Sequence, residues 1–172
     1  MVAPIIFLLD RSGSMETCWD DVIGGFNAFV KEQSQCDYLT LIQFDHEYTM
    51  SYSDRKICSV EPLTRETYIP RGTTALLDSI GKMIKETPGG PKTVVIFTDG
   101  LENASKNFTK AHVKDLIEQK TNEGWTFIYM GANQDAYAEA GAIGIAPRNT
   151  MEYDPRRTPE AFATLSSVVS QC

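Results

Sequence analysis

The chain has 172 residues, of which 42% are hydrophobic and 23% are charged, a composition typical of one globular domain. A chain of this length buries enough surface to fold without disulfides or a structural metal, so we expect one domain over residues 1–172. Its formal net charge of −7 argues against binding to nucleic acid, because no cluster of Lys and Arg is present to neutralise phosphates.

The first apolar run, Ile5 to Leu9, has the composition of a strand that is buried on both faces. It is far shorter than the ~20 residues that span a bilayer, and it lacks the basic flank and cleavage site of a signal peptide. We therefore expect a cytoplasmic protein that does not contact membranes. The next segment predicts an amphipathic helix from six apolar side chains at intervals of three and four: Trp19, Val22, Ile23, Phe26, Phe29 and Val30.

The middle of the chain predicts a hairpin and a second helix. Tyr38 to Phe44 alternates in polarity, and Glu47 to Tyr52 is expected to pair with it in an antiparallel hairpin. Residues 53–72 have no sustained period, so we expect a connection with at most a short strand around Ile57 to Val60. Helical spacing returns from Ala75 to Lys85.

The following part of the chain predicts two more buried strands with a helix between them. The strands are expected at Thr93 to Phe97 and Thr126 to Met130, and the helix at Ala111 to Glu123. Strands that alternate with helices along the chain indicate a parallel sheet with helices packed on its faces.

The last part of the chain predicts two helices. Residues 135–140 are rich in Ala and predict a short helix, whereas residues 146–155 fit no element. Thr158 is predicted to be the N-cap of the last helix, with Pro159 in its first turn.

The cysteines and histidines do not form a recognisable zinc site. The cysteines are far apart and form no C-x-x-C pair, which favours reduced thiols: Cys18, Cys36, Cys58 and Cys172. His46 and His112 are isolated in the sequence, and we interpret both as surface residues rather than ligands.

Side chains with oxygen atoms gather where the predicted strands end. The first strand ends in the sequence D-R-S-G-S, a later strand ends in T-D-G, and two threonines precede the second helix. The oxygen-bearing side chains in these places are Asp10, Ser12, Ser14, Thr73, Thr74 and Asp99. Ligands of open α/β sheets bind at the carboxyl edge of the sheet, so we expect these groups to meet there. An all-oxygen set favours a hard cation such as Mg²⁺.

These three motifs, D-x-S-x-S, G-T-T-A-L and the strand-terminal T-D-G, together resemble the metal-ion-dependent adhesion site of the von Willebrand factor A domain family. The resemblance covers roughly residues 2–145, and residues 146–172 add a C-terminal segment and helix. Locally the sequence looks most like the small stand-alone A domains of bacteria and their phages. The resemblance implies a Rossmann-like, three-layer α/β/α fold with a mostly parallel central sheet and one antiparallel edge strand.

The resemblance also implies the ligands of one divalent cation, Mg²⁺ or alternatively Mn²⁺ or Ca²⁺. The implied ligands are Asp10, Ser12, Ser14, Thr74 and Asp99. Thr73 stands where the family commonly has glycine, so it remains an alternative to Thr74. The rim of the site would be formed by Gly100, Glu102 and Asn103.

The resemblance implies a binding protein rather than an enzyme, monomeric on its own. With few directly bound carboxylates the ion keeps positive character, and an exchangeable coordination position accepts an Asp or Glu carboxylate of a protein partner. One alternative is a Mg²⁺-dependent phosphoester hydrolase, but aspartate-nucleophile phosphatases need a second acid where this chain has Ser12. Another alternative is a structural or assembly protein whose metal site is vestigial.

Overall fold

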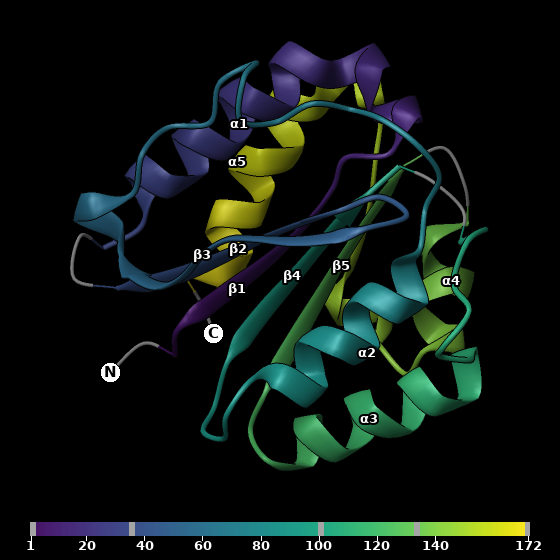
Figure 1. Ribbon diagram of the computed structural model, residues 1–172. Helices are drawn as coiled ribbons and strands as arrows, with labels where there is room; N and C mark the ends of the chain where they lie inside the picture. Colours follow the sequence, from purple (N-terminus) through teal and green to yellow (C-terminus); the bar gives the residue numbers. More distant parts are fainter. Residues whose placement is uncertain (1–2, 35–36, 100–101, 133–134, 171–172) are drawn as a thin grey trace.

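The computed structural model describes residues 3–34, 37–99, 102–132 and 135–170. These residues form a six-stranded sheet in the order β3-β2-β1-β4-β5-β6, with helices on both faces (Figure 1). The strands are β1 (Ile5–Asp10), β2 (Tyr38–Phe44), β3 (Tyr48–Lys56), β4 (Thr93–Thr98), β5 (Thr126–Ala132) and β6 (Thr150–Tyr153). The edge strand β3 is antiparallel to β2, and the other neighbouring strands pair in parallel. The α/β fold with one antiparallel edge strand is therefore confirmed.

Helices cover the two faces of the sheet in two separate layers. They are α1 (Trp19–Glu32), α2 (Leu76–Glu86), α3 (Lys110–Asn122), α4 (Ala136–Ala142) and α5 (Thr158–Val169). Helices α1 and α5 lie side by side on one face, and α2, α3 and α4 lie on the other (Figure 1). Among the described residues, no helix combines the length and the apolar character that a membrane span requires.

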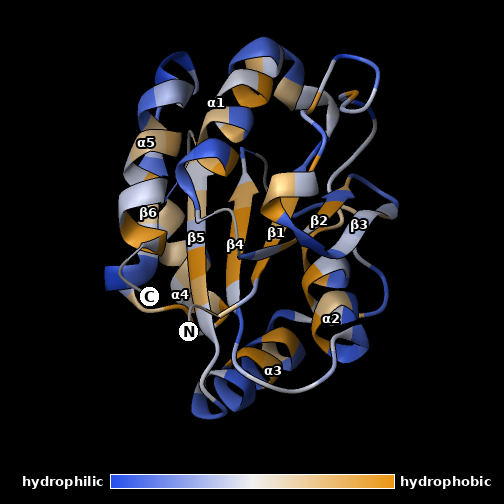
Figure 2. Ribbon diagram, turned by 90° about the vertical axis from the view of Figure 1, so that its left-hand side faces the viewer, coloured by the Kyte–Doolittle hydropathy of each residue, from blue (hydrophilic) through white to orange (hydrophobic). Residues whose placement is uncertain are grey.

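Two hydrophobic cores lie on opposite faces of the sheet. Along β1, Phe7 belongs to the core beneath α1 and α5, whereas Leu8 belongs to the core beneath α2, α3 and α4. Successive side chains of a strand point to opposite faces, so a strand covered on both sides must be apolar throughout. This explains the continuous hydrophobic colouring of β1 and β4 (Figure 2). In the first core, the rings of Phe7 and Phe26 pack edge to face with centroids 5.1 Å apart.

The parallel register aligns the carboxyl ends of three central strands. β1 pairs with β2 on one side, up to Asp10 opposite Phe44, and with β4 on the other, up to Leu9 opposite Phe97. The residues that end or follow these strands therefore lie at one edge of the sheet. Three acidic residues, Asp10, Asp45 and Asp99, occupy such positions.

The edge strand β3 is longer than the sequence predicted. It begins one residue later than Glu47 and continues to Lys56, because its antiparallel pairing with β2 extends to Tyr38 opposite Lys56. Most of its residues are exposed, so its sequence carries little of the alternation that reveals a half-buried strand. The short strand predicted around Ile57 to Val60 is wrong, since Ile57–Ser59 forms a 3₁₀ turn.

The C-terminal part differs from the sequence prediction in two places. Within residues 146–155, which fitted no element, Thr150–Tyr153 forms β6 and pairs with β5. The N-cap prediction for Thr158 is wrong: Thr158 is the first residue of α5, and its hydroxyl donates to the carbonyl of Pro155 at 2.8 Å. Pro159 does lie in the first turn, as predicted.

Candidate metal centre

Asp10 ends β1 and its side chain is completely buried. One carboxylate oxygen accepts a hydrogen bond from the Ser12 amide at 2.6 Å, and the other accepts from the Thr98 hydroxyl at 2.6 Å. The Tyr68 hydroxyl donates to the Asp10 carbonyl at 2.7 Å, which fixes the backbone as well. Burial raises the pKa of Asp10 although these side-chain and backbone hydrogen bonds act in the opposite direction. The carboxylate is thus firmly oriented by neutral hydrogen-bond donors.

Two serines connect Asp10 to Asp99 across the edge of the sheet. The Ser14 hydroxyl donates to a carboxylate oxygen of Asp99 at 2.8 Å, and the Ser12 and Ser14 hydroxyl oxygens lie 3.3 Å apart. Burial and, to a smaller extent, the negative charge of Asp10 raise the pKa of Asp99, whereas the hydrogen bond from Ser14 lowers it. The resulting pKa of Asp99 is about 6. We call Asp10, Ser12, Ser14 and Asp99 the Asp10 cluster. It joins four of the five predicted ligands.

The fifth predicted ligand, Thr74, lies on a segment that runs beside the loop after β1. The Gly13 amide donates to the Gly72 carbonyl at 3.0 Å, which ties the two loops together. Thr74 is 3% exposed, whereas its alternative Thr73 is exposed. Thr74 is therefore the more enclosed of the two candidate threonines, in the segment that directly precedes α2.

The predicted rim residues brace the Thr74 segment. The Asn103 side-chain oxygen accepts from the Thr74 amide at 2.9 Å, and the Thr74 carbonyl accepts from the Asn103 amide at 3.0 Å. Glu102 is half-buried and accepts from the Leu77 amide in the first turn of α2 at 3.3 Å. Gly100, the third predicted rim residue, lies outside the described residues.

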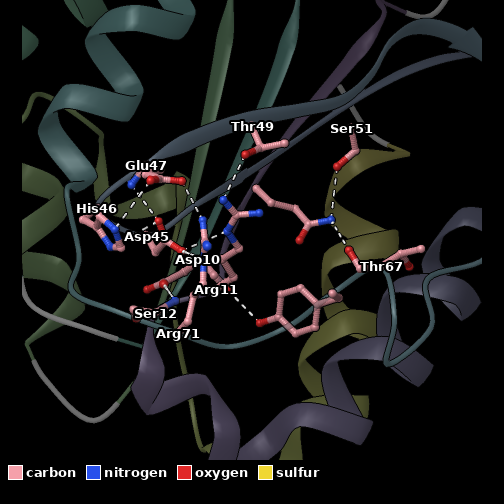
Figure 3. A network of polar contacts seen from close by, with 12 residues as sticks. Asp10, Arg11, Ser12, Asp45, His46, Glu47, Thr49, Ser51, Thr67 and Arg71 are labelled. Atoms are coloured by element: carbon pink, nitrogen blue, oxygen red, sulfur yellow. Dashed lines mark hydrogen bonds and ion pairs between the residues drawn. The ribbon is translucent and has the colours of Figure 1, made fainter.

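A second acidic group at this edge was not predicted from the sequence. Asp45 directly follows β2, and its side chain is 0% exposed. One of its carboxylate oxygens accepts from Arg11 Nε at 3.1 Å and from Arg71 Nε at 2.7 Å, while the other accepts from the Glu47 amide at 2.6 Å (Figure 3). Arg71 also pairs with the Glu47 carboxylate at 2.7 Å. We call Arg11, Asp45, Glu47 and Arg71 the Asp45 cluster.

The charges around Asp45 are balanced. Burial alone would raise the pKa of Asp45, but the hydrogen bonds from Glu47 and Arg71 and the two guanidinium charges outweigh it and hold the pKa below its usual value. Asp45, His46 and Glu47 offer ligand atoms within 4.8 Å of one another, so this group could hold a metal ion. The arginines already occupy its carboxylates and would repel a further cation. His46 has 48% of its side chain exposed, which confirms its predicted surface position.

The Asp10 cluster fits a divalent cation better than the Asp45 group does. Its two carboxylates accept hydrogen bonds from hydroxyl and amide groups, whereas Asp45 accepts from two guanidinium groups. Its other donor atoms are hydroxyl oxygens, and hard cations such as Mg²⁺ prefer oxygen ligands. A signal for Asp45 was present in the sequence, since it follows a strand directly, as Asp99 does.

The fold and the site define an α/β domain with an oxygen-lined carboxyl edge. The chain belongs to the von Willebrand factor type A domain family, whose model matches residues 3–140. No curated protein is significantly similar to the chain in sequence.

Solved structures of this fold are similar over nearly the whole chain. One is proximal thread matrix protein 1 from the mussel byssus with a zinc-occupied MIDAS motif, at 17% identity and a TM-score of 0.71, covering 98% of this chain and 47% of the mussel protein. The pilus adhesin SpaC from Lactobacillus rhamnosus GG has 14% identity and a TM-score of 0.71, covering 98% of this chain and 30% of SpaC.

A third similar structure is the vWF domain of the type V pili tip protein Mfa5 from Porphyromonas gingivalis. It has 11% identity and a TM-score of 0.69, covering 99% of this chain and 96% of that domain. At these identities the likeness shows the fold alone. The chain spans about half the length of the mussel protein.

Proposed function

We propose that this domain binds a protein partner through a divalent cation. The cation would be Mg²⁺, with Mn²⁺ or Ca²⁺ as alternatives, and its ligands would be Asp10, Ser12, Ser14, Thr74 and Asp99. When bound, it supplies a positive charge with an exchangeable coordination position for an Asp or Glu carboxylate of the partner.

The observation that carries this proposal is the contact between Ser14 and Asp99. These residues are 85 positions apart in the sequence, yet the Ser14 hydroxyl lies 2.8 Å from the Asp99 carboxylate. The same serine lies 3.3 Å from Ser12, whose amide donates to Asp10. Oxygen atoms from the carboxyl ends of two strands thus converge, and an all-oxygen set of this kind suits a hard divalent cation.

Some residues of the cluster orient the buried ligand Asp10, and others lie at the surface of the site. Thr98 and the Ser12 amide each hold one oxygen of the buried Asp10 carboxylate, so this ligand is preorganised. Ser14 is exposed, which places the opposite side of the cluster at the surface, where a partner can approach.

We propose binding rather than catalysis. The Ser14 hydroxyl contacts Ser12 and Asp99, and among the described residues no hydrogen bond joins either serine hydroxyl to a histidine that could act as a general base. The similar proteins named above are described as a byssus matrix protein, a pilus adhesin and a pilus tip protein. We further propose that residues 1–172 act as one domain in the cytoplasm, monomeric in the absence of the partner.

Calorimetric titration with Mg²⁺, Mn²⁺ and Ca²⁺ tests the metal site. We expect Mg²⁺ to bind the wild-type domain and Ser14→Ala to weaken binding at least about tenfold, because the variant loses a ligand and the contact that orients Asp99. Ser59→Ala is the matched control, since Ser59 is also an exposed serine in a 3₁₀ turn. If the wild-type domain shows neither heat nor a thermal shift at millimolar metal, the proposal is wrong.

Affinity capture with and without EDTA tests the partner class. A partner that binds through the site should be released by EDTA and should not be captured by Ser14→Ala. Amidation of the partner's carboxylates should also abolish capture, because the proposed contact is a carboxylate on the metal. Capture of the amidated partner with undiminished yield would contradict the carboxylate contact.

A further inference from the structure

We propose that Asp45 is a positioning residue that holds the two metal-binding loops in register. This inference rests on the proposed function of the Asp10 cluster. Asp45 belongs to neither loop, yet contacts from its side chain or backbone reach both of them (Figure 3).

The first loop is attached to Asp45 through Arg11, which stands between the proposed ligands Asp10 and Ser12. Arg11 Nε donates to Asp45 at 3.1 Å, and the Arg11 amide donates to the Phe44 carbonyl at 2.8 Å. The side chain and the backbone of Arg11 therefore both hold this loop against the end of β2. Since Arg11 is flanked by two ligands, a shift of its backbone would displace both.

The second loop is attached to Asp45 at both of its ends. At one end, Arg71 Nε donates to Asp45 at 2.7 Å; at the other, the Ala75 amide donates to the Asp45 carbonyl at 2.8 Å. Thr73 and Thr74, the two candidate ligands from this loop, lie between these anchors. The Arg71 amide also donates to the Arg11 carbonyl at 2.7 Å, so the two loops are bonded directly to each other.

A single carboxylate oxygen of Asp45 receives both guanidinium groups. The Arg11 side chain is 12% exposed and the Asp45 side chain is 0% exposed, so this pair is shielded from solvent. Removing the carboxylate would leave two positive charges close together, one of them nearly buried. The Asp45 side chain therefore supplies one anchor to each loop.

Asp45 could also act through charge alone, by neutralising arginines that would otherwise repel a cation. Asp45→Asn removes both the anchor and one negative charge. The double variant Asp45→Asn with Arg71→Gln restores the net charge and leaves the anchor broken. If Asp45 positions the loops, the double variant stays impaired; if it acts through charge, the double variant recovers.

The experiment measures Mg²⁺ affinity of the full chain by calorimetry for the wild type, Asp45→Asn, the double variant and Asp20→Asn. Asp20→Asn is the matched control, because Asp20 forms an exposed pair with Arg65 at 2.7 Å that has no contact with either loop. We expect about 10–100-fold weaker binding for Asp45→Asn, at least about tenfold weaker binding for the double variant, and less than twofold change for the control.

A second readout needs no metal. Hydrogen exchange at the Arg71 and Gly13 amides, followed by NMR, reports the hydrogen bonds between the two loops. Exchange should be at least tenfold faster in both Asp45 variants than in the wild type. If Asp45→Asn does not fold, Arg71→Gln alone provides the test, because Arg71 is half-exposed and contributes one of the two anchors.

The outcomes separate this inference from the proposed function. Unchanged Mg²⁺ affinity and unchanged amide exchange in Asp45→Asn would overturn the positioning role, as would recovery of both by the double variant. A wild-type chain that does not bind Mg²⁺ would refute the proposed function, whereas faster exchange in the variants would still support the anchoring of the loops.

Discussion

Two buried aspartates at neighbouring strand ends behave in opposite ways. Asp10 ends β1 and Asp45 directly follows β2, and both side chains are fully enclosed. The pKa of Asp10 is raised because burial outweighs its hydrogen bonds to neutral groups. The pKa of Asp45 is lowered, against the effect of burial, because hydrogen bonds and two guanidinium groups stabilise the charged form.

The comparison distinguishes two acidic clusters at this edge of the sheet by the charges around them. The Asp45 cluster contains its own positive charges, so its carboxylates are already neutralised. The Asp10 cluster combines two carboxylates with neutral hydroxyl and amide donors. Proximity of acidic groups is therefore a weaker guide to a metal site than the charge balance around them.

Replacing Asp10 or Asp45 by Asn should give the largest expected difference in Mg²⁺ affinity and in stability. Asp10→Asn should weaken Mg²⁺ binding more than about 100-fold, because it removes a ligand charge. The metal-free Asp10→Asn variant should keep or exceed the wild-type melting temperature, since a buried charge close to Asp99 is lost. Asp45→Asn should instead lower the stability by about 3 kcal/mol, because it leaves the nearly buried Arg11 without its carboxylate partner. Calorimetric titration and thermal melts without metal measure both effects.

A lower melting temperature for Asp10→Asn than for Asp45→Asn would reverse the comparison. Circular dichroism of both variants provides the control that the fold is retained. Such a reversal would mean that the hydrogen bonds to Asp10 from Thr98 and Ser12 stabilise the native state more than its buried charge destabilises it.

The sequence predicted where Asp10 and Asp99 lie better than it predicted the contacts of Asp45. Asp10 and Asp99 end or follow strands that are buried throughout and largely apolar, so their places at the carboxyl edge could be read directly. Asp45 follows a strand in the same way, but it falls between the two strands of the predicted hairpin. Its role depends on Arg11 and Arg71, and no local pattern indicates that residues 60 positions apart meet on one carboxylate.

The parts of the sheet that the sequence did not predict, the end of β3 and the whole of β6, are exposed or short. β3 lies at the edge of the sheet with most side chains exposed, so its end at Lys56 left no hydrophobic signal. β6 has four residues, too few for a period to be recognised, and its place is set by parallel pairing with β5. Pairing with a neighbouring strand determines where β3 ends and where β6 lies, whereas the buried strands can be predicted from their apolar composition.

Substitution of Gly72, which lies between the two clusters, should have an intermediate effect on stability and on Mg²⁺ binding. Gly72 has a φ of +68°, and a Cβ there would lie 2.4 Å from Nδ1 of His46. Gly72→Ala should therefore lower the stability by about 1–2 kcal/mol. It should also weaken Mg²⁺ binding, because the Gly72 carbonyl accepts from the Gly13 amide between the two proposed metal-binding loops. Urea denaturation and calorimetry measure these changes.

Gly24→Ala is the matched control for Gly72→Ala. Gly24 is exposed in α1 with no atom within 4 Å of an added Cβ, so alanine should stabilise the domain by about 0.5–1 kcal/mol. Wild-type metal affinity in Gly72→Ala would show that the two clusters are not coupled through this segment.

The smallest expected effect is a pH dependence that separates the two clusters without any mutation. The pKa of Asp99 is about 6 in the folded domain, above its ordinary value, so the folded state binds more protons than the unfolded state between about pH 4 and 6. Asp99 therefore lowers the stability of the metal-free domain as pH rises through 6.

Protons compete with the metal for the same oxygens, so Mg²⁺ affinity should fall, by up to about tenfold, from pH 7 to pH 5. Asp45 has a lowered pKa and stays ionised over this range, so the anchoring of the loops should not change. Calorimetry at pH 5, 6 and 7 measures the Mg²⁺ affinity, and amide exchange at Arg71, corrected for its intrinsic pH dependence, measures the anchoring of the loops. Equal Mg²⁺ affinity at all three pH values would remove Asp99 from the ligand set.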